Sequence, residues 1–169
     1  SSEHGVQWWL QSKGPESVKL MDAEELAPEL QMLSYELPDF DLVMNFRPTD
    51  FTQVNPFINE VMVSKAVNLL GIAKTDRIID WFCGLGNFTL PIATLAREVV
   101  GIEGSQSMVE LAQLNLSINS KAASLYPDRL CGVDFYSQNL FEMTDEKLYE
   151  LGTADKWLID PPREGAHAL

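Results

Sequence analysis

The chain has 169 residues, of which 46% are hydrophobic and 22% charged, a balance typical of a globular protein with a substantial core. Its formal net charge is -13, from 12 basic and 25 acidic residues, which argues against a protein that binds nucleic acid through its own basic surface. No apolar run approaches the ~20 residues that span a bilayer, and the N-terminus lacks a secretory pattern. We therefore expect a cytoplasmic protein with no membrane partner.

Residues 1–46 predict a small β segment. Short apolar or alternating runs, separated by Lys13-Gly14-Pro15 and by an acidic stretch, are typical of strands and turns. These runs are Val6 to Leu10, Val18 to Met21, Met32 to Leu37 and Leu42 to Phe46. We interpret residues 1–46 as part of a central linking subdomain and residues 47–169 as a separate, partial cofactor-binding domain. Because the chain begins without Met and stops soon after an apolar strand, we expect it to be a fragment of a longer protein.

From Arg47 onward, predicted helices alternate with short apolar strands. Asn55-Pro56 supplies an N-cap and a first-turn proline, so we expect a helix from there through Leu70, with a stop at Gly71. The later strands are expected at 77–82, 98–103, 133–137 and 156–159, and the later helices at 87–96, 105–119 and 144–151. Ser107 and Glu110 form a capping-box pattern at the start of the second of these helices. Short strands that are apolar on both faces predict a parallel sheet with helices on either side, which binds ligands at the carboxyl ends of its strands.

The first strand of this sheet leads into a turn that contains Gly84 and Gly86. Glycine adopts backbone angles closed to other residues and allows a ligand to approach the main chain. A dinucleotide site requires a third glycine where Thr89 stands, which disfavours a nicotinamide oxidoreductase. The D-x-x-x-G-x-G pattern that starts at Asp80 is instead typical of S-adenosylmethionine sites. An ordinary tight turn between strand and helix is the alternative.

Three polar residues at the ends of later strands extend this prediction. Glu103 ends the second strand, where an acid accepts hydrogen bonds from both hydroxyls of a ribose; the alternative is a solvated acid. Asn139 follows the third strand and could meet an adenine amino group or simply form a turn. Asp160 precedes Pro161-Pro162, whose fixed backbone either aims the carboxylate into the crevice or merely ends the strand.

Together these motifs resemble those of the RNA (uracil-5-)-methyltransferases, most closely the bacterial members that act on 23S ribosomal RNA. The matching segments are Phe46 to Asn55, Asp80 to Pro91, Val99 to Gly104 and Asp160 to Arg163. The resemblance implies an incomplete α/β fold of the class I (Rossmann-like) methyltransferases, with S-adenosyl-L-methionine as cofactor. It also implies that the longer protein forms 5-methyluridine in ribosomal RNA, with no DNA partner.

The resemblance assigns roles to individual residues. With the two glycines included, the implied cofactor-binding set is Gln53, Phe82, Gly84, Gly86, Asn87, Glu103, Asn139 and Asp160. Phe51, Gln53 and Asp160 are expected to face the target uracil. Family members carry an RNA-binding β-barrel, and some carry a [4Fe-4S] cluster; we expect neither the barrel nor the cluster ligands in this chain.

Uracil C5 is a poor nucleophile, so the reaction requires a thiolate that adds at C6 and a base that removes the C5 proton. In the family both groups follow the D-P-P-R motif at a distance that places them beyond Leu169. We therefore expect no catalytic residue here, and a chain that binds the cofactor weakly without methylating RNA. Cys83 and Cys131 offer no metal-ligand spacing. We reject both as nucleophiles, because Cys83 is expected to pack within the glycine turn and Cys131 has no neighbouring base or cation in the sequence.

Two other classes of protein stay open. An amino methyltransferase that acts on a nucleobase or a protein glutamine uses a similar Pro-Pro turn, but normally follows it with an aromatic residue where Arg163 stands here. The second is a noncatalytic module that binds RNA or protein.

Overall fold

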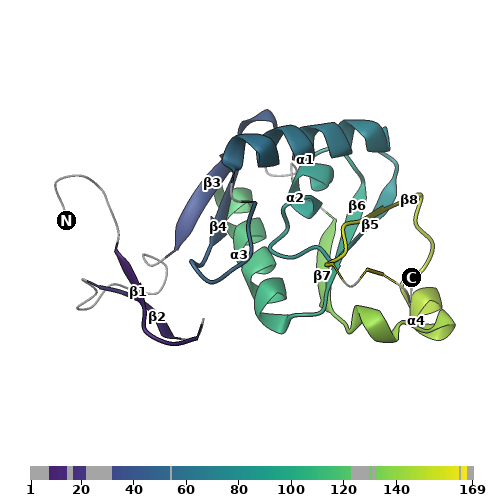
Figure 1. Cartoon of the computed structure of the whole chain (residues 1–169). Coiled ribbons are helices and arrows are strands. Elements are labelled where there is room, and N and C mark those ends of the chain that lie inside the picture. Colours follow the sequence, from purple (N-terminus) through teal and green to yellow (C-terminus); the bar gives the residue numbers. More distant parts are fainter. Residues whose placement is uncertain are drawn as a thin grey trace.

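A parallel sheet of four strands forms the centre of the protein (Figure 1). The structure is a computed structural model that describes residues 8–14, 17–21, 32–53, 55–122, 130, 132–163 and 165–166. The strands, in their order across the sheet, are β7 (Val133–Ser137), β6 (Glu98–Glu103), β5 (Arg77–Trp81) and β8 (Lys156–Ile159). All three pairings are parallel, which confirms the sheet that the sequence predicts.

Both faces of the central strands are buried, as expected for a parallel sheet. Ile78 packs in a cluster with α1 (Pro56–Leu70), α2 (Thr89–Ala93) and α3 (Gln106–Ala122). Ile79 and Trp81 point to the other face and pack with residues of the 3-10 helix η4 (Leu140–Glu142) and of α4 (Asp145–Glu150). Alternate residues of one strand therefore hold two layers of helices around the sheet.

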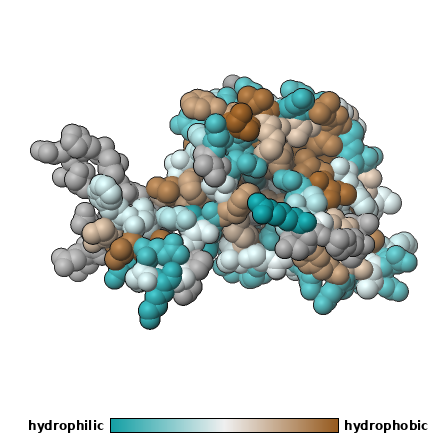
Figure 2. Space-filling view, in the orientation of Figure 1, coloured by the Kyte–Doolittle hydropathy of each residue, from teal (hydrophilic) through white to brown (hydrophobic). Residues whose placement is uncertain are grey.

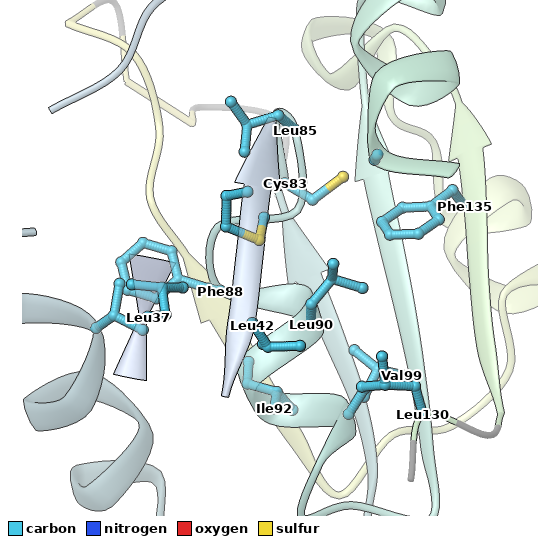
Figure 3. Close-up of a cluster of buried hydrophobic side chains, with 14 of the residues drawn as sticks. Leu37, Leu42, Cys83, Leu85, Phe88, Leu90, Ile92, Val99, Leu130 and Phe135 are labelled. Atoms are coloured by element: carbon cyan, nitrogen blue, oxygen red, sulfur yellow. The ribbon is translucent and has the colours of Figure 1, made fainter. Parts of the chain in front are cut away.

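Two antiparallel hairpins precede the sheet and confirm the predicted β content of this part of the chain. The first pairs β1 (Trp9–Gln11) with β2 (Val18–Leu20), and the second pairs β3 (Leu33–Leu37) with β4 (Leu42–Phe46) through the 3-10 helix η3 (Pro38–Phe40). The second hairpin adds to the main core: Figure 3 shows Leu37 beside Phe88, and Leu42 belongs to the same cluster. The division of the chain at residue 46 stays a prediction.

Side-chain amides of α3 attach the second hairpin to the rest of the fold. Asn115 Oδ1 accepts from Asn45 N at 2.8 Å, and Asn115 Nδ2 donates to Asn45 O at 3.1 Å. Asn119 repeats this arrangement with the N and O atoms of Val43, at 2.9 and 2.8 Å. Asn115 and Asn119 are four residues apart on the helix, a rise of about 6 Å. Val43 and Asn45 are two residues apart on the strand, a rise of about 6.7 Å, so each asparagine lies opposite its own strand residue. Asn115 Nδ2 also donates to the carbonyl of Leu85 at 3.2 Å, which links the hairpin to the glycine turn.

Helix α1 starts and stops where the sequence predicts. Asn55 Oδ1 accepts from the N–H groups of the first turn, and Gly71 ends the helix with φ 56°. Figure 2 shows hydrophobic side chains gathered over this helix, and those exposed on it are Phe57, Ile58, Val61 and Leu69. Within the described ranges, no helix has the length and apolarity needed to cross a membrane.

The other two predicted helices on this face differ from the structure in their bounds. Helix α2 covers Thr89–Ala93 and not 87–96, because the N–H groups of Leu95 and Ala96 both bond to Ile92 O and turn the chain toward β6. The capping box at Ser107 was wrong. Helix α3 covers Gln106–Ala122 and not 105–119, so Ser107 lies inside its first turn. The N–H of Ser105, just before the helix, donates to Glu103 Oε1.

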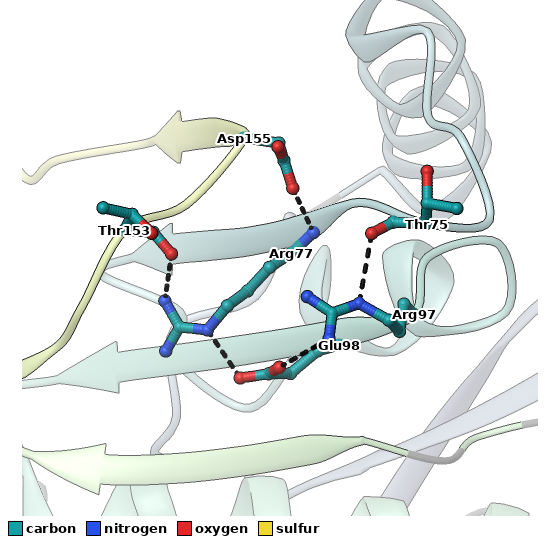
Figure 4. A network of polar contacts seen from close by, with 6 residues as sticks. All are labelled: Thr75, Arg77, Arg97, Glu98, Thr153 and Asp155. Atoms are coloured by element: carbon teal, nitrogen blue, oxygen red, sulfur yellow. Dashed lines mark hydrogen bonds and ion pairs between the residues drawn. The ribbon is translucent and has the colours of Figure 1, made fainter.

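The strand ends opposite the glycine turn are joined by a polar network around Arg77 (Figure 4). The guanidinium donates to Glu98 Oε1 at 2.5 Å and to Thr153 O at 2.9 Å, and the Arg77 N–H donates to Asp155 Oδ2 at 2.8 Å. These bonds connect the starts of β5 and β6 with the turn that leads into β8.

Candidate functional site

A cavity of about 1150 Å³ lies at the carboxyl ends of the parallel strands. Its lining comes from the turn after β5, the ends of β6 and β8, the segment after β7, and residues 49–53. The predicted site residues that line it are Phe51, Gln53, Phe82, Gly84, Asn87, Glu103, Asn139 and Asp160. The fold therefore brings together side chains that are widely separated in the sequence, in a cavity large enough for a nucleoside-sized ligand.

The turn after β5 has a backbone geometry that few residues tolerate. Gly84 and Gly86 have φ values of 55° and 92°, as the sequence suggests. Phe82 has φ 61°, which costs a bulky residue about 1 kcal/mol. Its ring lies 6.1 Å from that of Phe141, so two aromatic rings contribute to the cavity wall. Neither the angle at Phe82 nor the contribution of Phe141 had a signal in the sequence.

Gly86 is the one residue of the predicted set that faces the core. It is buried, and a Cβ atom there would lie 3.5 Å from Leu90 and 3.6 Å from Phe135. Its carbonyl accepts from Leu90 N at 3.1 Å. Gly86 thus turns the chain into α2 and packs against the core, behind the residues that line the cavity.

The Glu103 carboxylate holds both sides of the turn region. Oε2 accepts from Gly84 N at 3.0 Å, and Oε1 accepts from Ser105 N at 3.0 Å. Each carboxylate oxygen can accept a second hydrogen bond. Glu103 can therefore fix the glycine turn and still accept hydroxyl groups from a ligand in the cavity.

The remaining polar residues of the predicted set differ in how firmly they are held. Gln53, Asn139 and Asp160 are exposed at the cavity. Asn139 Oδ1 accepts from Phe141 N at 3.1 Å and caps η4, which is the turn-forming role considered above. Asn87 is bound by two residues that the sequence did not single out, Tyr35 and Asn59.

Cys83 is buried, with its sulfur directed toward Phe135 (Figure 3). Burial raises the pKa of the Cys83 thiol well above its ordinary range, and the nearby carboxylates of Asp80 and Glu103 raise it further. A buried thiol of this kind is a poor nucleophile at neutral pH. Cys131, the other cysteine, lies outside the described residues.

Asp80 is a buried carboxyl below the glycine turn. Its Oδ2 accepts from Thr89 Oγ1 at 2.5 Å, while its Oδ1 has no hydrogen-bond partner among the described residues. Burial, reinforced by the carboxylates of Asp160 and Glu103 and opposed by the Thr89 hydrogen bond, raises the pKa of Asp80 to about 7. Thr89, where a dinucleotide site would have glycine, thus joins α2 to β5.

Replacing Asp80 by asparagine is expected to change how stability depends on pH. The folded-state pKa of about 7 lies above the ordinary value of 3.8, so the native protein holds this proton when the unfolded chain has lost it. Ionisation of Asp80 therefore lowers the wild-type free energy of unfolding as pH rises from about 4 to about 7, by up to about 4 kcal/mol. Asparagine does not ionise, so the variant lacks this loss. Urea unfolding should therefore show that, relative to the wild type, the free energy of unfolding of the variant is higher at pH 8 than at pH 5.

Asp134→Asn, at an exposed position of β7, is the matched control and should leave the difference between the two pH values unchanged. If Asp80→Asn and the wild type lose stability in parallel over this range, then Asp80 is already ionised in the native protein.

The fold and the site define the class of protein. A parallel sheet with a glycine turn after its first strand and an acid at the end of the second is the fold of the class I S-adenosylmethionine-dependent methyltransferases. The structure of Pyrococcus abyssi tRNA (uracil-54, C5)-methyltransferase in complex with S-adenosyl-L-homocysteine is similar, with a TM-score of 0.62 and 23% identity, over 81% of this chain and 30% of that one. A SAM-dependent methyltransferase from Agrobacterium tumefaciens gives a TM-score of 0.58 and 17% identity, over 86% and 43%.

The chain belongs to the tRNA (uracil-5-)-methyltransferase family, whose model matches residues 25–168. It is 57% identical over 169 residues to 23S rRNA (uracil(1939)-C(5))-methyltransferase RlmD of Paracidovorax citrulli, with coverage of 100% of this chain and 33% of the relative. It is 49% identical to RlmD of Bordetella pertussis, with coverage of 100% and 34%. The chain thus spans about a third of the length of the curated relatives that it matches. The family and the fold predicted from the sequence are confirmed.

Proposed function

We propose that the chain is the cofactor-binding part of an enzyme that methylates C5 of a uridine in 23S ribosomal RNA. The observation that carries this proposal is the convergence of Phe82, Asn87, Glu103 and Asp160 on one cavity at the carboxyl ends of the parallel strands. Membership of the uracil-5-methyltransferase family supports the reaction, and the identity to relatives named RlmD supports ribosomal RNA as the substrate.

The charge of the cavity favours S-adenosyl-L-methionine over a dinucleotide. Its lining carries the carboxylates of Asp50, Glu103 and Asp160, and Arg163 is the cationic side chain among the described lining residues. Such a surface attracts a sulfonium ion and repels a pyrophosphate. When bound, the cofactor supplies an electrophilic methyl group.

We assign each part of the cofactor to residues that fit it. Glu103 has acceptor capacity for the ribose hydroxyls, and Phe82 with Phe141 provides an apolar wall for the adenine, near Asn139. The amino-acid end is assigned to the side of Asn87 and Gln53. Gly84 allows close approach of the ligand to the main chain.

The uracil is assigned to the exposed side of the same cavity. Phe51 is 82% exposed and lines the cavity together with Gln53 and Asp160, so an extruded base could stack on its ring. Because the net charge of the chain is -13, we assign the grip on the RNA backbone to other parts of the longer protein. Ribosomal RNA as substrate also implies a cytoplasmic location.

The nucleophilic thiolate and the base are assigned to the longer protein as well. Cys83 is buried and its thiol pKa is raised, so it does not serve. A [4Fe-4S] cluster, if the longer protein carries one, would also be bound elsewhere. In the ranges that the structure describes, no group of three His, Cys, Asp or Glu side chains is placed to hold a metal.

Calorimetric titration and methyl transfer test this proposal. The 169-residue chain should bind S-adenosyl-L-homocysteine but not NAD, and should not methylate RNA. A longer protein that includes this chain should transfer labelled methyl groups to 23S ribosomal RNA and yield 5-methyluridine on nucleoside analysis. Label on an exocyclic amino group would instead indicate an amino methyltransferase. Failure to bind S-adenosyl-L-homocysteine, together with intact binding of RNA, would indicate a noncatalytic module.

A further inference from the structure

The side chains of Asn87 and Asn59 form a reciprocal amide pair. Asn59 Nδ2 donates to Asn87 Oδ1 at 3.1 Å, and Asn87 Nδ2 donates back to Asn59 Oδ1 at 2.9 Å. The Tyr35 hydroxyl donates to the same Asn87 Oδ1 at 2.7 Å. Three elements, β3, α1 and the glycine turn, therefore meet at one amide group.

Burial and protonation favour a fixed arrangement of this network. Asn59 is 3% exposed and lies on the buried face of α1, in line with Val63 and Val67. The Tyr35 hydroxyl, like that of any tyrosine, is protonated and able to donate at neutral pH, and burial raises its pKa further. Tyr35 and Asn87 line the cavity.

The network limits what Asn87 can offer to a ligand. An amide oxygen has two lone pairs and an amide nitrogen has two hydrogens. Both lone pairs of Asn87 Oδ1 are used, by Tyr35 and Asn59, and one hydrogen of Nδ2 is used by Asn59. One N–H is left, so Asn87 can donate to a ligand but cannot accept from it.

We propose that Tyr35 and Asn59 are positioning residues that fix Asn87 as a donor to the carboxylate of the cofactor's amino-acid end. The inference rests on the proposed function, which places this end near Asn87. An amide that can only donate does not recognise the ammonium group of the same end. A hydrogen-bond donor is also what a carboxylate needs in a cavity lined by Asp50, Glu103 and Asp160, because the negative charges of these residues disfavour its own charge.

The test compares two ligands by calorimetry on the 169-residue chain. The first is S-adenosyl-L-homocysteine, and the second is its decarboxylated analogue, which keeps the amine, the thioether and the adenosine. The wild type is expected to prefer the carboxylate ligand by about tenfold or more, as for one hydrogen bond to a charged group. Tyr35→Phe and Asn59→Ala should reduce this preference about threefold to tenfold and change affinity for the analogue by less than about twofold.

Tyr149→Phe and Asn68→Ala are the matched controls, since both positions are exposed and Asn68 lies on the same helix as Asn59. Both should keep the wild-type preference. If the variants lose affinity equally for the two ligands, Tyr35 and Asn59 have only a structural role. If the affinity of the variants for both ligands is unchanged, the network does not contribute to binding. Either result overturns the inference. If Asn59→Ala does not fold, Tyr35→Phe decides. A wild type that binds both ligands equally refutes the inference alone, whereas one that binds neither refutes the proposed function.

Discussion

Replacing Asn115 by alanine is expected to lower the free energy of unfolding by about 3 kcal/mol. The substitution removes the partners of Asn45 N, Asn45 O and Leu85 O, and Asn115 itself is fully buried. A buried polar group without a partner costs about 1–3 kcal/mol, while the better helix propensity of alanine returns only about 0.5 kcal/mol. Urea unfolding followed by circular dichroism measures the difference.

Two further variants separate the contributions at this site. Gln113→Ala, on the exposed face of α3, should leave stability within about 0.5 kcal/mol of the wild type. Asn119→Ala should destabilise the protein but affect cofactor binding less than Asn115→Ala, because of the two only Asn115 contacts the glycine turn, at Leu85. A loss below about 1 kcal/mol for Asn115→Ala would mean that these amide bonds add little to stability.

Replacing Glu103 by alanine is expected to weaken the binding of S-adenosyl-L-homocysteine about 100-fold. Two hydrogen bonds from ribose hydroxyls to a carboxylate contribute about 3 kcal/mol, which corresponds to this factor. The variant also frees the N–H groups of Gly84 and Ser105, so the glycine turn loses an anchor. Calorimetric titration of the folded variant gives the affinity directly.

The affinity of Glu103→Gln should fall between those of the wild type and Glu103→Ala. Its amide oxygen can still accept a hydrogen bond, but its NH2 group would face a backbone N–H group, and two donors cannot bond to each other. Glu110→Ala, at an exposed position of α3, is the control for the loss of a negative charge and should bind as the wild type does. Affinity within about threefold of the wild type for a folded Glu103→Ala protein would place the ribose elsewhere.

The strands and the first long helix could be predicted because their signals are local. Asn55-Pro56 and Gly71 mark the two ends of α1 through capping geometry that only neighbouring residues decide. The strand from Glu98 to Glu103 is apolar on both faces, which is the mark of a parallel strand buried by two layers. Glu103, Asn139 and Asp160 could be predicted from these strands, because each ends a strand or follows one closely. Phe51, Gln53, Phe82 and Asn87 were expected from the family resemblance.

The polar contacts that support the site could not be predicted in the same way. Asn59, Asn115 and Asn119 each interact with residues that are distant in the sequence, so no local pattern names their partners. One signal was present: each is an amide on the buried and otherwise apolar face of a helix, where an unbonded amide is costly. Such a position indicates a buried partner but not which one. The helix α2 was predicted, but its length was overestimated because its end depends on the turn into β6.

The attachment of β4 to α3 also protects the hairpin from pairing with other chains. An exposed strand edge presents free N–H and C=O groups to which a strand of another molecule can add. On β4 the groups of Val43 and Asn45 are already bonded to Asn119 and Asn115. Two asparagines on a helix thus close a β edge against the addition of another strand, and the same two residues hold the hairpin against the part of the fold that forms the cavity.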